Sequence, residues 1–231
     1  MPPDVVEISD LLLNDKNSFF RFDWEKIILK EERTEKKLKE TVKCVYAALK
    51  HTENYISDEY DFIDKLLPEK ITFITSQELE DRYPDLTPKQ REYEAAKEYG
   101  AYFLMQIGGV LKSGNIHDGR APDYDDWTLN GDIIFWNELL GIAFEISSMG
   151  IRVDPAAMDR QLTAANCDHR RELPFHKMLL ADQLPLTIGG GIGQSRLCML
   201  LIGCAHIGEV QTSLWDADTL RICAENNIPL L

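Results

Sequence analysis

Apolar residues recur every three to four positions between residues 38 and 49, and this spacing is typical of one face of a helix. The segment DWEKIILKEERTEKKLKETVKCVYAALKHTENYI carries them as Leu38, Val42, Val45, Tyr46 and Leu49. The pattern predicts a long helix whose charged run, EERTEKKLKE, faces solvent. Asp23 stands at the head of this segment, and on its own it would be interpreted as the cap of the helix.

Shorter apolar runs, bounded by glycine, proline or polar residues, predict strands. These runs are KITFITS (70–76), AYFLMQI (101–107), DIIFWN (132–137) and IAFEISSMGIRV (142–153), with a further candidate at residues 209–215. Thr75 and Thr87 each stand three residues before a glutamate or glutamine, which is a capping box, and Asp154 precedes a proline. We expect a helix after each of these three residues.

Antiparallel strands with helices grouped to one side, and no regular strand–helix alternation, indicate the α+β class. We therefore expect an antiparallel sheet flanked by helices. Residues 1–21 show no clear period and predict an irregular lead-in, whereas residues 22–231 are long enough for one domain.

Composition narrows the class of protein. The chain has 231 residues, of which 44% are hydrophobic, and this is enough for one sizeable core. No apolar run approaches the length of a membrane span, and the acidic start MPPDVVEISD differs from a signal or transit peptide, so we expect a cytoplasmic protein without a membrane partner. The five cysteines lack CxxC spacing, which argues against a disulfide framework or a structural zinc site. The formal net charge of -14 opposes nucleic-acid phosphates and argues against a tRNA partner.

Three consecutive glycines precede a helical run in residues 186–208, LTIGGGIGQSRLCMLLIGCAHIG. Because glycine has no Cβ atom, a flat ligand can lie on the backbone at Gly189, Gly190 and Gly191. Arg196 lies in the first turn of the helix, where its guanidinium can stack on an aromatic base or bind a phosphate. The alternative is a flexible loop before a core helix, which the apolar flanks on both sides make less favoured.

Two acidic residues, Asp132 and Glu145, lie in apolar strands joined by a short turn. A hairpin centred between Glu138 and Leu139 places them opposite one another on one face. Two adjacent carboxylates repel each other and lose hydration, so a cation is favoured, and Mg²⁺ that also binds nucleotide phosphates fits this requirement. Alternatively, Asp132 begins its strand in solvent and Glu145 pairs with a lysine.

The segment HDGRAPDYDDW (117–127) concentrates acidic residues in a short turn. Pro122 fixes its backbone, and Tyr124 and Trp127 are large, so the loop is expected to be rigid and partly buried. A carboxylate held there could bind the ammonium group of an amino-acid substrate. A solvated acidic loop is the usual meaning of such a string.

Ser147, Ser148 and Arg152 follow Glu145 on the same predicted strand. Hydroxyls and an arginine at the end of an apolar strand suit recognition of a carboxylate, which arginine can bind through two parallel hydrogen bonds. A strand end that reaches water would have the same pattern. None of the five histidines has a spaced partner for a metal, and no Ser/His/Asp or Cys/His nucleophile arrangement stands out.

Four strings occur in order along the chain: RAPDYDDW, LNGDI, FEISSMGIRVD and GGGIGQSRL. The last resembles motif 3 of the class II aminoacyl-tRNA synthetase fold, in which a glycine-rich strand and a helical arginine hold the adenine of ATP. Together they resemble the ammonia-dependent aspartate–ammonia ligase family, also called A-type asparagine synthetase, over roughly residues 22–231. The resemblance implies a class II synthetase-like catalytic domain that lacks the family's N-terminal third, including the motif 1 dimer helix, so that a homodimer would be weakened. Arg21 and Gln106 stand where the family has glutamine and glycine.

The reaction that this resemblance implies is the ATP-dependent amidation of aspartate by ammonia. The β-carboxylate would attack ATP and release pyrophosphate, and ammonia would displace AMP from the β-aspartyl adenylate to give asparagine. The implied partners are small molecules, with ATP and Mg²⁺ as cofactors. Alternatives are a catalytically silent paralogue that binds nucleotide or aspartate and, disfavoured by the chain's acidity, a synthetase that charges tRNA.

The residue patterns and the resemblance together predict a role for each site residue. The nucleotide would be bound by Arg196, Gly189, Gly190, Gly191, Ser147 and Asp132. Mg²⁺ would be bound by Asp132 and Glu145. Aspartate would be bound by Asp125, Ser148, Arg152 and Asp23. The catalytic residues would be Arg196, Asp125 and Asp23.

Overall fold

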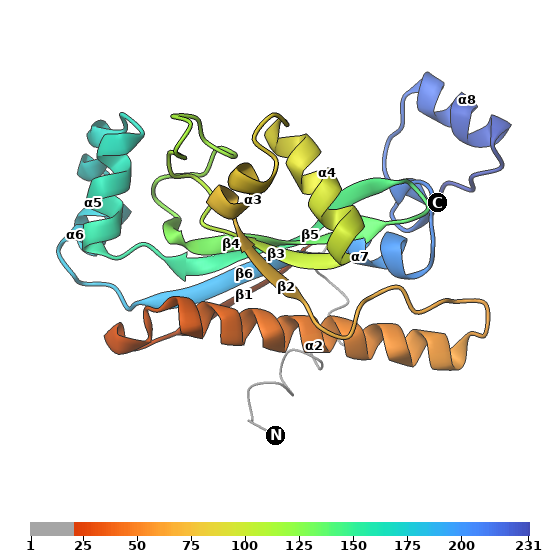
Figure 1. The fold of residues 1–231 in the computed structure, drawn as a ribbon, viewed down its shortest axis with the longest axis horizontal. Coiled ribbons are helices and arrows are strands. Elements are labelled where there is room, and N and C mark those ends of the chain that lie inside the picture. The colour runs from red at the N-terminus through yellow and green to blue at the C-terminus, as the bar shows by residue number, and fades with distance from the viewer. Residues whose placement is uncertain (1–20) are drawn as a thin grey trace.

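The computed structural model describes residues 21–231, which form a six-stranded sheet with helices on both faces (Figure 1). Its strands are β1 (Arg21–Ile27), β2 (Thr72–Thr75), β3 (Ala101–Met105), β4 (Asp125–Asn137), β5 (Ile142–Arg152) and β6 (Thr187–Gly193). They lie in the order β1-β6-β5-β4-β3-β2, and every neighbouring pair is antiparallel except the parallel pair β2 and β3. The predicted α+β class is confirmed. Apart from Arg21, the predicted lead-in lies outside the described residues.

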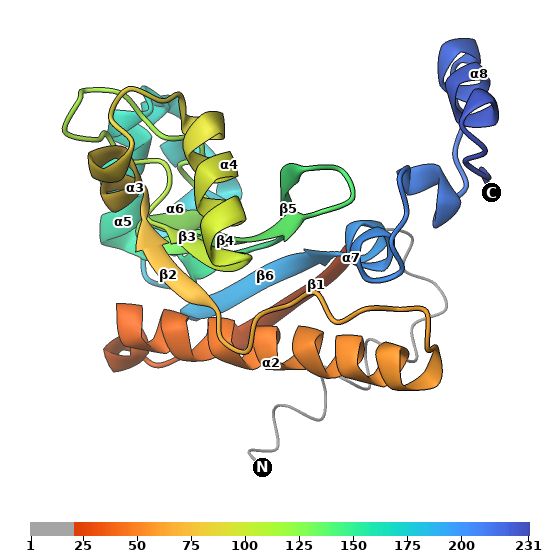
Figure 2. The same ribbon diagram turned by 45° about the vertical axis from the view of Figure 1, so that its right-hand side comes forward.

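The prediction that the helices group on one side of the sheet was wrong. They are α2 (Glu35–Glu59), α3 (Ser76–Arg82), α4 (Pro88–Tyr99), α5 (Pro155–Ala164), α6 (Pro174–Leu180), α7 (Gln194–Leu201) and α8 (Ala217–Glu225), with 3-10 helices η1 (Lys30–Glu32), η2 (Asp168–Glu172) and η3 (Ile207–Glu209). In Figures 1 and 2, α2 runs along one face of the sheet, while α3 and α4 lie over the other. Within residues 21–231, no helix combines the length and apolar character that a membrane span requires.

Alternation of side chains along the strands gives the sheet two different faces. On one face, the buried residues of α2 pack against Phe103, Phe135 and Met149. On the other, α3 and α4 cover Tyr102 and Leu104. Toward β1 and β6 this second face carries polar residues. We call the face of the sheet opposite α2 the site face.

The predicted long helix begins later than expected. Residues 21–27 form β1, which pairs with β6 along its whole length, and α2 starts after Thr34, whose hydroxyl accepts a hydrogen bond from the amide of Lys37. Asp23 is therefore a strand residue and not a helix cap. The alternation in FDWEK explains the difference, because Phe22 and Trp24 pack into the core on the α2 side while Asp23 points to the opposite face.

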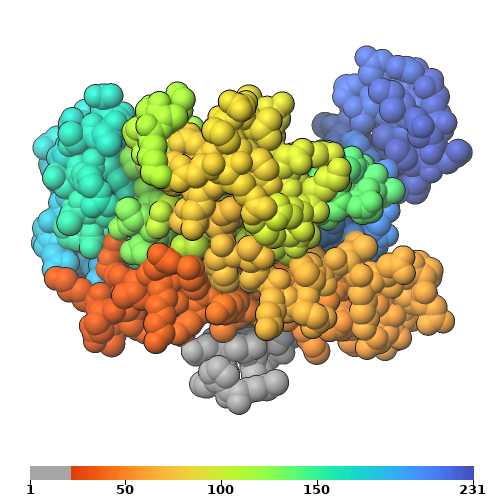
Figure 3. Space-filling model, in the orientation of Figure 1, coloured from red at the N-terminus to blue at the C-terminus, as the bar shows by residue number. Residues whose placement is uncertain are grey.

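Local capping signals were predicted correctly. Thr75 and Thr87 both form capping boxes, and Asp154 accepts a hydrogen bond from the amide of Ala157 at the start of α5. The predicted strand at residues 209–215 was wrong. His206 and Glu209 form a capping box that turns the chain into η3, and α8 follows after Asp216. Figure 3 shows that α8 projects from the rest of the molecule.

Gln106, which directly follows β3, has a left-handed backbone with φ of 61°. Its amide donates to the carbonyl of Asn130, and its carbonyl accepts from the Ser76 hydroxyl at 2.7 Å, so contacts on both sides hold this conformation. For a residue with a side chain, this conformation costs about 1–2 kcal/mol. Gln106 therefore stores strain beside the site face.

Replacement of Gln106 by glycine should relieve that strain. Because glycine is also more flexible in the unfolded chain, we expect Gln106→Gly to leave the free energy of unfolding unchanged or raise it by up to about 1 kcal/mol. Gln106→Val should lower it by about 1–3 kcal/mol, since a β-branched residue tolerates this conformation poorly. Urea unfolding of both variants would check this. A glycine variant less stable than the valine variant would contradict it.

Candidate functional site

One row of residues crosses the site face from β1 to β4. Asp23 lies opposite Gly191, Gly191 lies opposite Ser148, and Ser148 lies opposite Asp132. Because cross-strand partners share a face, these residues are neighbours although they are far apart in the sequence. The row brings together the expected substrate residues Asp23 and Ser148 with the expected nucleotide residue Asp132.

The predicted pairing of Asp132 with Glu145 was wrong. Asp132 faces Ser148, and Glu145 faces Ile134, two residues further along β4. The turn is centred one residue later than predicted, and the ladder skips Ile146, which forms a bulge in β5. Because Ile134 and Asp132 lie on the same face of β4, Glu145 still reaches the site face, but diagonally from Asp132.

Asp132 is nearly fully buried, and its counterion is Arg120 from the preceding loop. A nitrogen of the Arg120 guanidinium donates to Oδ2 of Asp132, and another donates to Asp118 at 2.9 Å. The pKa of Asp132 is raised to about 7, mainly because the carboxyl is buried. The charge of Arg120 opposes this shift, and the charge of Glu145 adds to it. The other oxygen, Oδ1, is buried and makes no hydrogen bond of ordinary geometry with residues 21–231.

A second cluster forms around Arg152 at the end of β5. Its Nη1 atom donates to Asp125 at 2.5 Å, and its Nη2 atom donates to Glu25 at 2.8 Å. The guanidinium also lies 4.1 Å from the centre of the Tyr124 ring. Burial raises the pKa of Asp125, Arg152 opposes that shift, and the charge of Glu25 adds to it. Arg152 is thus shared between two carboxylates, of which Asp125 is buried and Glu25 is exposed.

The sequence predicted that a ligand lies on the backbone of all three glycines of β6, but other residues fill the space at two of them. A Cβ atom on Gly189 would lie 2.0 Å from Oε2 of Glu25, so this glycine makes room for the cluster around Arg152. Gly190 points to the opposite face, where a Cβ atom would lie 2.4 Å from that of Met149. Of the three glycines, Gly191 remains in the row beside Ser148. A ligand that lies on the backbone of β6 is therefore expected only at the Gly191 end of the strand.

Ser147 and Arg196, both expected to contact the nucleotide, have different positions. Ser147 is buried on the α2 side of the sheet between Ile133 and Ile192, because it directly precedes Ser148 and so points the opposite way. Its side chain cannot contact a nucleotide on the site face. Arg196 is exposed at the start of α7, and its Nη1 atom donates to the carbonyl of Glu145 at 3.0 Å.

Sequence reasoning missed three features of this site. Glu25 shares the alternation in FDWEK that places Asp23 on the site face, and this signal could have identified it. Arg120 lies within the RAPDYDDW string, but its pairing with Asp132 depends on the course of the loop. That loop is anchored by two buried histidines, since His117 pairs with Glu92 at 3.0 Å and His176 pairs with Asp123 at 2.9 Å.

The comparisons with known proteins place the chain in a sequence family and a fold. A model of the family described as aspartate-ammonia ligase matches residues 11–227. An aspartate–ammonia ligase of Fusobacterium nucleatum is 62% identical over 91% of this chain and 64% of its own length. One from Bacillus cytotoxicus is 58% identical over 91% of this chain and 64% of its own. The chain thus spans less than two thirds of the length of these relatives.

Solved structures with similar folds are class II aminoacyl-tRNA synthetases. An aspartyl-tRNA synthetase from Entamoeba histolytica has a TM-score of 0.57 and 16% identity, and covers 94% of this chain and 51% of its own. An asparaginyl-tRNA synthetase from Pyrococcus horikoshii, complexed with asparaginyl-adenylate, has a TM-score of 0.56 and 17% identity, and covers 82% and 45%. At this identity the likeness shows the fold alone.

Room for the Asp125 side chain depends on Gly150, which lies on the neighbouring strand. A Cβ atom there would lie 2.7 Å from Cγ of Asp125, which is buried and held by Arg152. We expect Gly150→Ala to lower the free energy of unfolding by about 1–3 kcal/mol. Gly109→Ala is the matched control, because its Cβ atom would have no neighbour within 4 Å, and it should change stability by less than about 0.5 kcal/mol. Equal thermal unfolding temperatures for the two variants would show that Asp125 is not confined in this way.

Proposed function

We propose, because this chain belongs to the aspartate–ammonia ligase family, that it converts aspartate, ATP and ammonia to asparagine, AMP and pyrophosphate. The observation that carries this proposal is the arrangement of β4 and β5. At one end, Asp125 and Arg152 provide a carboxylate and a guanidinium side by side. Further along the same strands Asp132 and Glu145 provide two carboxylates, and Arg196 donates to the backbone carbonyl of Glu145. An amino acid and a nucleotide can therefore lie next to each other on one sheet.

Aspartate is proposed to bind at the Arg152 end. Its ammonium group would be held by Asp125, and a carboxylate of the substrate would take the place of Glu25 on Arg152, since Glu25 is the exposed partner of that arginine. Ser148 and Asp23 follow in the row toward Asp132. They would contact the end of aspartate that reacts.

The nucleotide is proposed to bind at the other end, with Arg196 on the adenine or phosphates and Gly191 beneath. Asp132 and Glu145 are the residues that would hold Mg²⁺, which neutralises phosphate charge when bound. The buried Oδ1 atom of Asp132, which makes no ordinary hydrogen bond with residues 21–231, supports this assignment. Two carboxylates alone do not complete a cation site, and phosphate oxygens would supply further ligands.

The chemistry follows from positioning and charge. An oxygen of the β-carboxylate forms a bond to the α-phosphorus of ATP, and pyrophosphate leaves with the electrons of the broken bond. The nitrogen of ammonia then bonds to the acyl carbon, AMP leaves, and the nitrogen loses a proton to solvent. Arg196 and Arg120 would stabilise the negative charge that develops on the phosphate. Neither step requires a covalent protein nucleophile.

The proposed partners are small molecules in the cytoplasm. The formal net charge of -14 supports this part of the proposal, because a chain so acidic repels nucleic-acid phosphates.

Incubation of the chain with aspartate, MgATP and ammonium tests the reaction directly. We expect AMP and asparagine to accumulate in equal amounts, and only when both aspartate and ammonium are present. Omission of each component in turn is the control. If ATP raises the thermal unfolding temperature but no AMP forms in the complete mixture, the chain binds the nucleotide without the proposed catalysis.

Two arginine variants should separate the two ends of the site. Arg152→Ala should raise the KM for aspartate about 10- to 100-fold with little change in the KM for MgATP, because one or two charge-assisted hydrogen bonds of about 1.5–3 kcal/mol are lost. Arg196→Ala should do the reverse and weaken the binding of MgATP. Steady-state kinetics or calorimetric titration with each substrate would measure both effects. If either variant weakens the binding of aspartate and of MgATP equally, the assignment of the two substrates to different ends of the site is wrong.

A further inference from the structure

The site proposed for aspartate lies where the regular ladder between β4 and β5 breaks. Apart from the bulge at Ile146, the ladder is continuous down to the pair Asn130 and Gly150, but the next pair is Asp125 with Arg152. Four residues of β4, numbers 126–129, therefore stand opposite the single residue Ile151 of β5. Beyond this irregularity, the amide of Val153 donates to the carbonyl of Tyr124 at 2.9 Å and Arg152 binds Asp125 directly, and contacts from other elements add to the positioning of these two residues.

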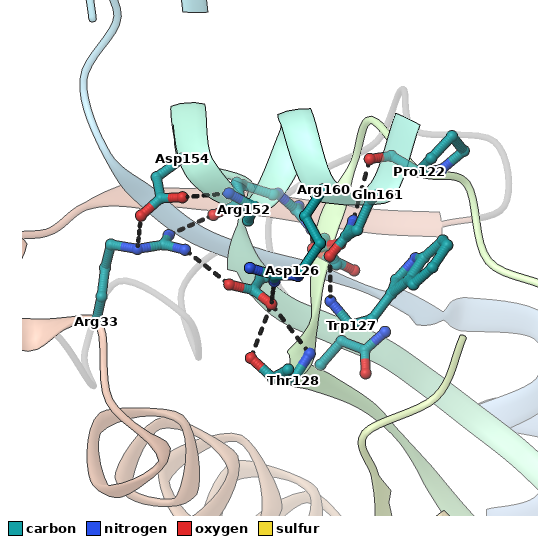
Figure 4. A network of polar contacts seen from close by, with 12 residues as sticks. Arg33, Pro122, Asp126, Trp127, Thr128, Arg152, Asp154, Arg160 and Gln161 are labelled. Atoms are coloured by element: carbon teal, nitrogen blue, oxygen red, sulfur yellow. Dashed lines mark hydrogen bonds and ion pairs between the residues drawn. The ribbon is translucent and has the colours of Figure 1, made fainter. Parts of the chain in front are cut away.

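Arg33, which lies between η1 and α2, supplies these contacts (Figure 4). Its Nη2 atom donates to Asp126 at 3.0 Å, and its Nη1 atom donates to the backbone carbonyl of Arg152 at 2.5 Å. Its Nε atom lies 3.1 Å from Asp154, which caps α5. One guanidinium thus joins the residue after Asp125 to the backbone of Arg152.

Gln161 of α5 contacts the backbone on the other side of Asp125, and Figure 4 shows its hydrogen bonds to Pro122 and Trp127. Its amide nitrogen donates to the carbonyls of Pro122 and Asp125, both at 3.0 Å, and its amide oxygen accepts from the backbone of Trp127 at 2.8 Å. Gln161 is only 1% exposed. The backbone around Asp125 is therefore clamped from α5, while Arg33 ties the same segment to β5.

Burial and charge show that Arg33 acts within the structure and not as a ligand-binding residue. Its side chain is 7% exposed, and its charge is matched by the carboxylates of Asp126 and Asp154. Asp126 also accepts hydrogen bonds from the amide and hydroxyl of Thr128. Within residues 21–231, Arg33 makes no hydrogen bond or ion pair with the side chains of Asp125 or Arg152, and it influences them through the backbone and the neighbouring residue.

We infer that Arg33 is a positioning residue of the proposed aspartate site: it sets the separation and orientation of Asp125 and Arg152, and so the affinity for aspartate. The inference rests on the proposed function. Arginine suits this role because its planar guanidinium reaches three groups in fixed directions. Lysine would keep the charge but could not bind the three groups in the same geometry, so Arg33→Lys changes the geometry without removing the positive charge.

Calorimetric titration of the full chain with aspartate, and separately with MgATP, tests this inference. Arg33→Lys should weaken aspartate binding at least 10-fold and change MgATP binding less than twofold. Arg160→Lys is the matched control, because Arg160 also contacts Asp126, at 3.3 Å, but is more than half exposed and lies on the outer side of the network. It should change neither affinity by more than twofold. In turnover, Arg33→Lys should raise the KM for aspartate more than it lowers kcat.

A second, milder variant keeps the test decisive if Arg33→Lys does not fold. Asp154→Asn removes the charge that faces Nε of Arg33 but retains an oxygen able to cap α5, so the helix should persist. We expect it to weaken aspartate binding two- to fivefold and to leave MgATP binding unchanged. The inference is overturned if the folded Arg33→Lys and Asp154→Asn variants bind aspartate as tightly as the unmodified chain does. It is also overturned if they lose affinity for aspartate and MgATP equally. If the unmodified chain binds MgATP but not aspartate, the proposed function fails and this inference with it.

Discussion

The site depends on the pairing of buried carboxylates with arginines along β4. A carboxylate taken out of water costs several kcal/mol unless a counterion and hydrogen bonds compensate it. Three aspartates of this strand are at most 7% exposed, and each has an arginine partner from a different part of the chain. The pairs are Asp125 with Arg152, Asp126 with Arg33, and Asp132 with Arg120. β4 can therefore be buried only where β5, the segment before α2 and the 117–124 loop lie close together. The site residues consequently depend on the same contacts that stabilise the fold.

The three pairs differ in how completely they satisfy their carboxylates. Both carboxylate oxygens of Asp126 accept hydrogen bonds, one from Arg33 and the other from Thr128, and these bonds hold the neighbouring backbone in place. Asp125 shares Arg152 with Glu25, which is exposed and which the proposal replaces with a substrate carboxylate. Asp132 keeps one buried oxygen without an ordinary hydrogen bond within the described residues, and its pKa is raised to about 7. The two incompletely satisfied pairs are those at which the proposal places aspartate and the nucleotide.

Local sequence signals predicted the elements better than the contacts between them. Capping boxes at Thr75 and Thr87, and the strands around Asp132 and Ser148, follow from interactions within a few residues and were correct. The position of the turn and the bulge at Ile146 have no local signal, so the predicted pairing of Asp132 with Glu145 was wrong.

Residues whose roles depend on distant neighbours were also missed. The strong helical period of α2 obscured the alternation in FDWEK, and with it the strand that carries Asp23 and Glu25. Gly189 was expected to support a ligand, but the close approach of Glu25 explains the glycine there. The family resemblance predicted the class II fold correctly, because it depends on strings of residues and not on register.

A crystal structure of the chain with a non-hydrolysable analogue of β-aspartyl adenylate would test the account most directly. The account predicts that the amino-acid part contacts Asp125 and Arg152, with Glu25 displaced from Arg152, and that the phosphate lies near Asp132, Arg120 and Arg196. Binding of the analogue elsewhere, or with Glu25 still paired to Arg152 and Asp132 remote from the phosphate, would contradict it.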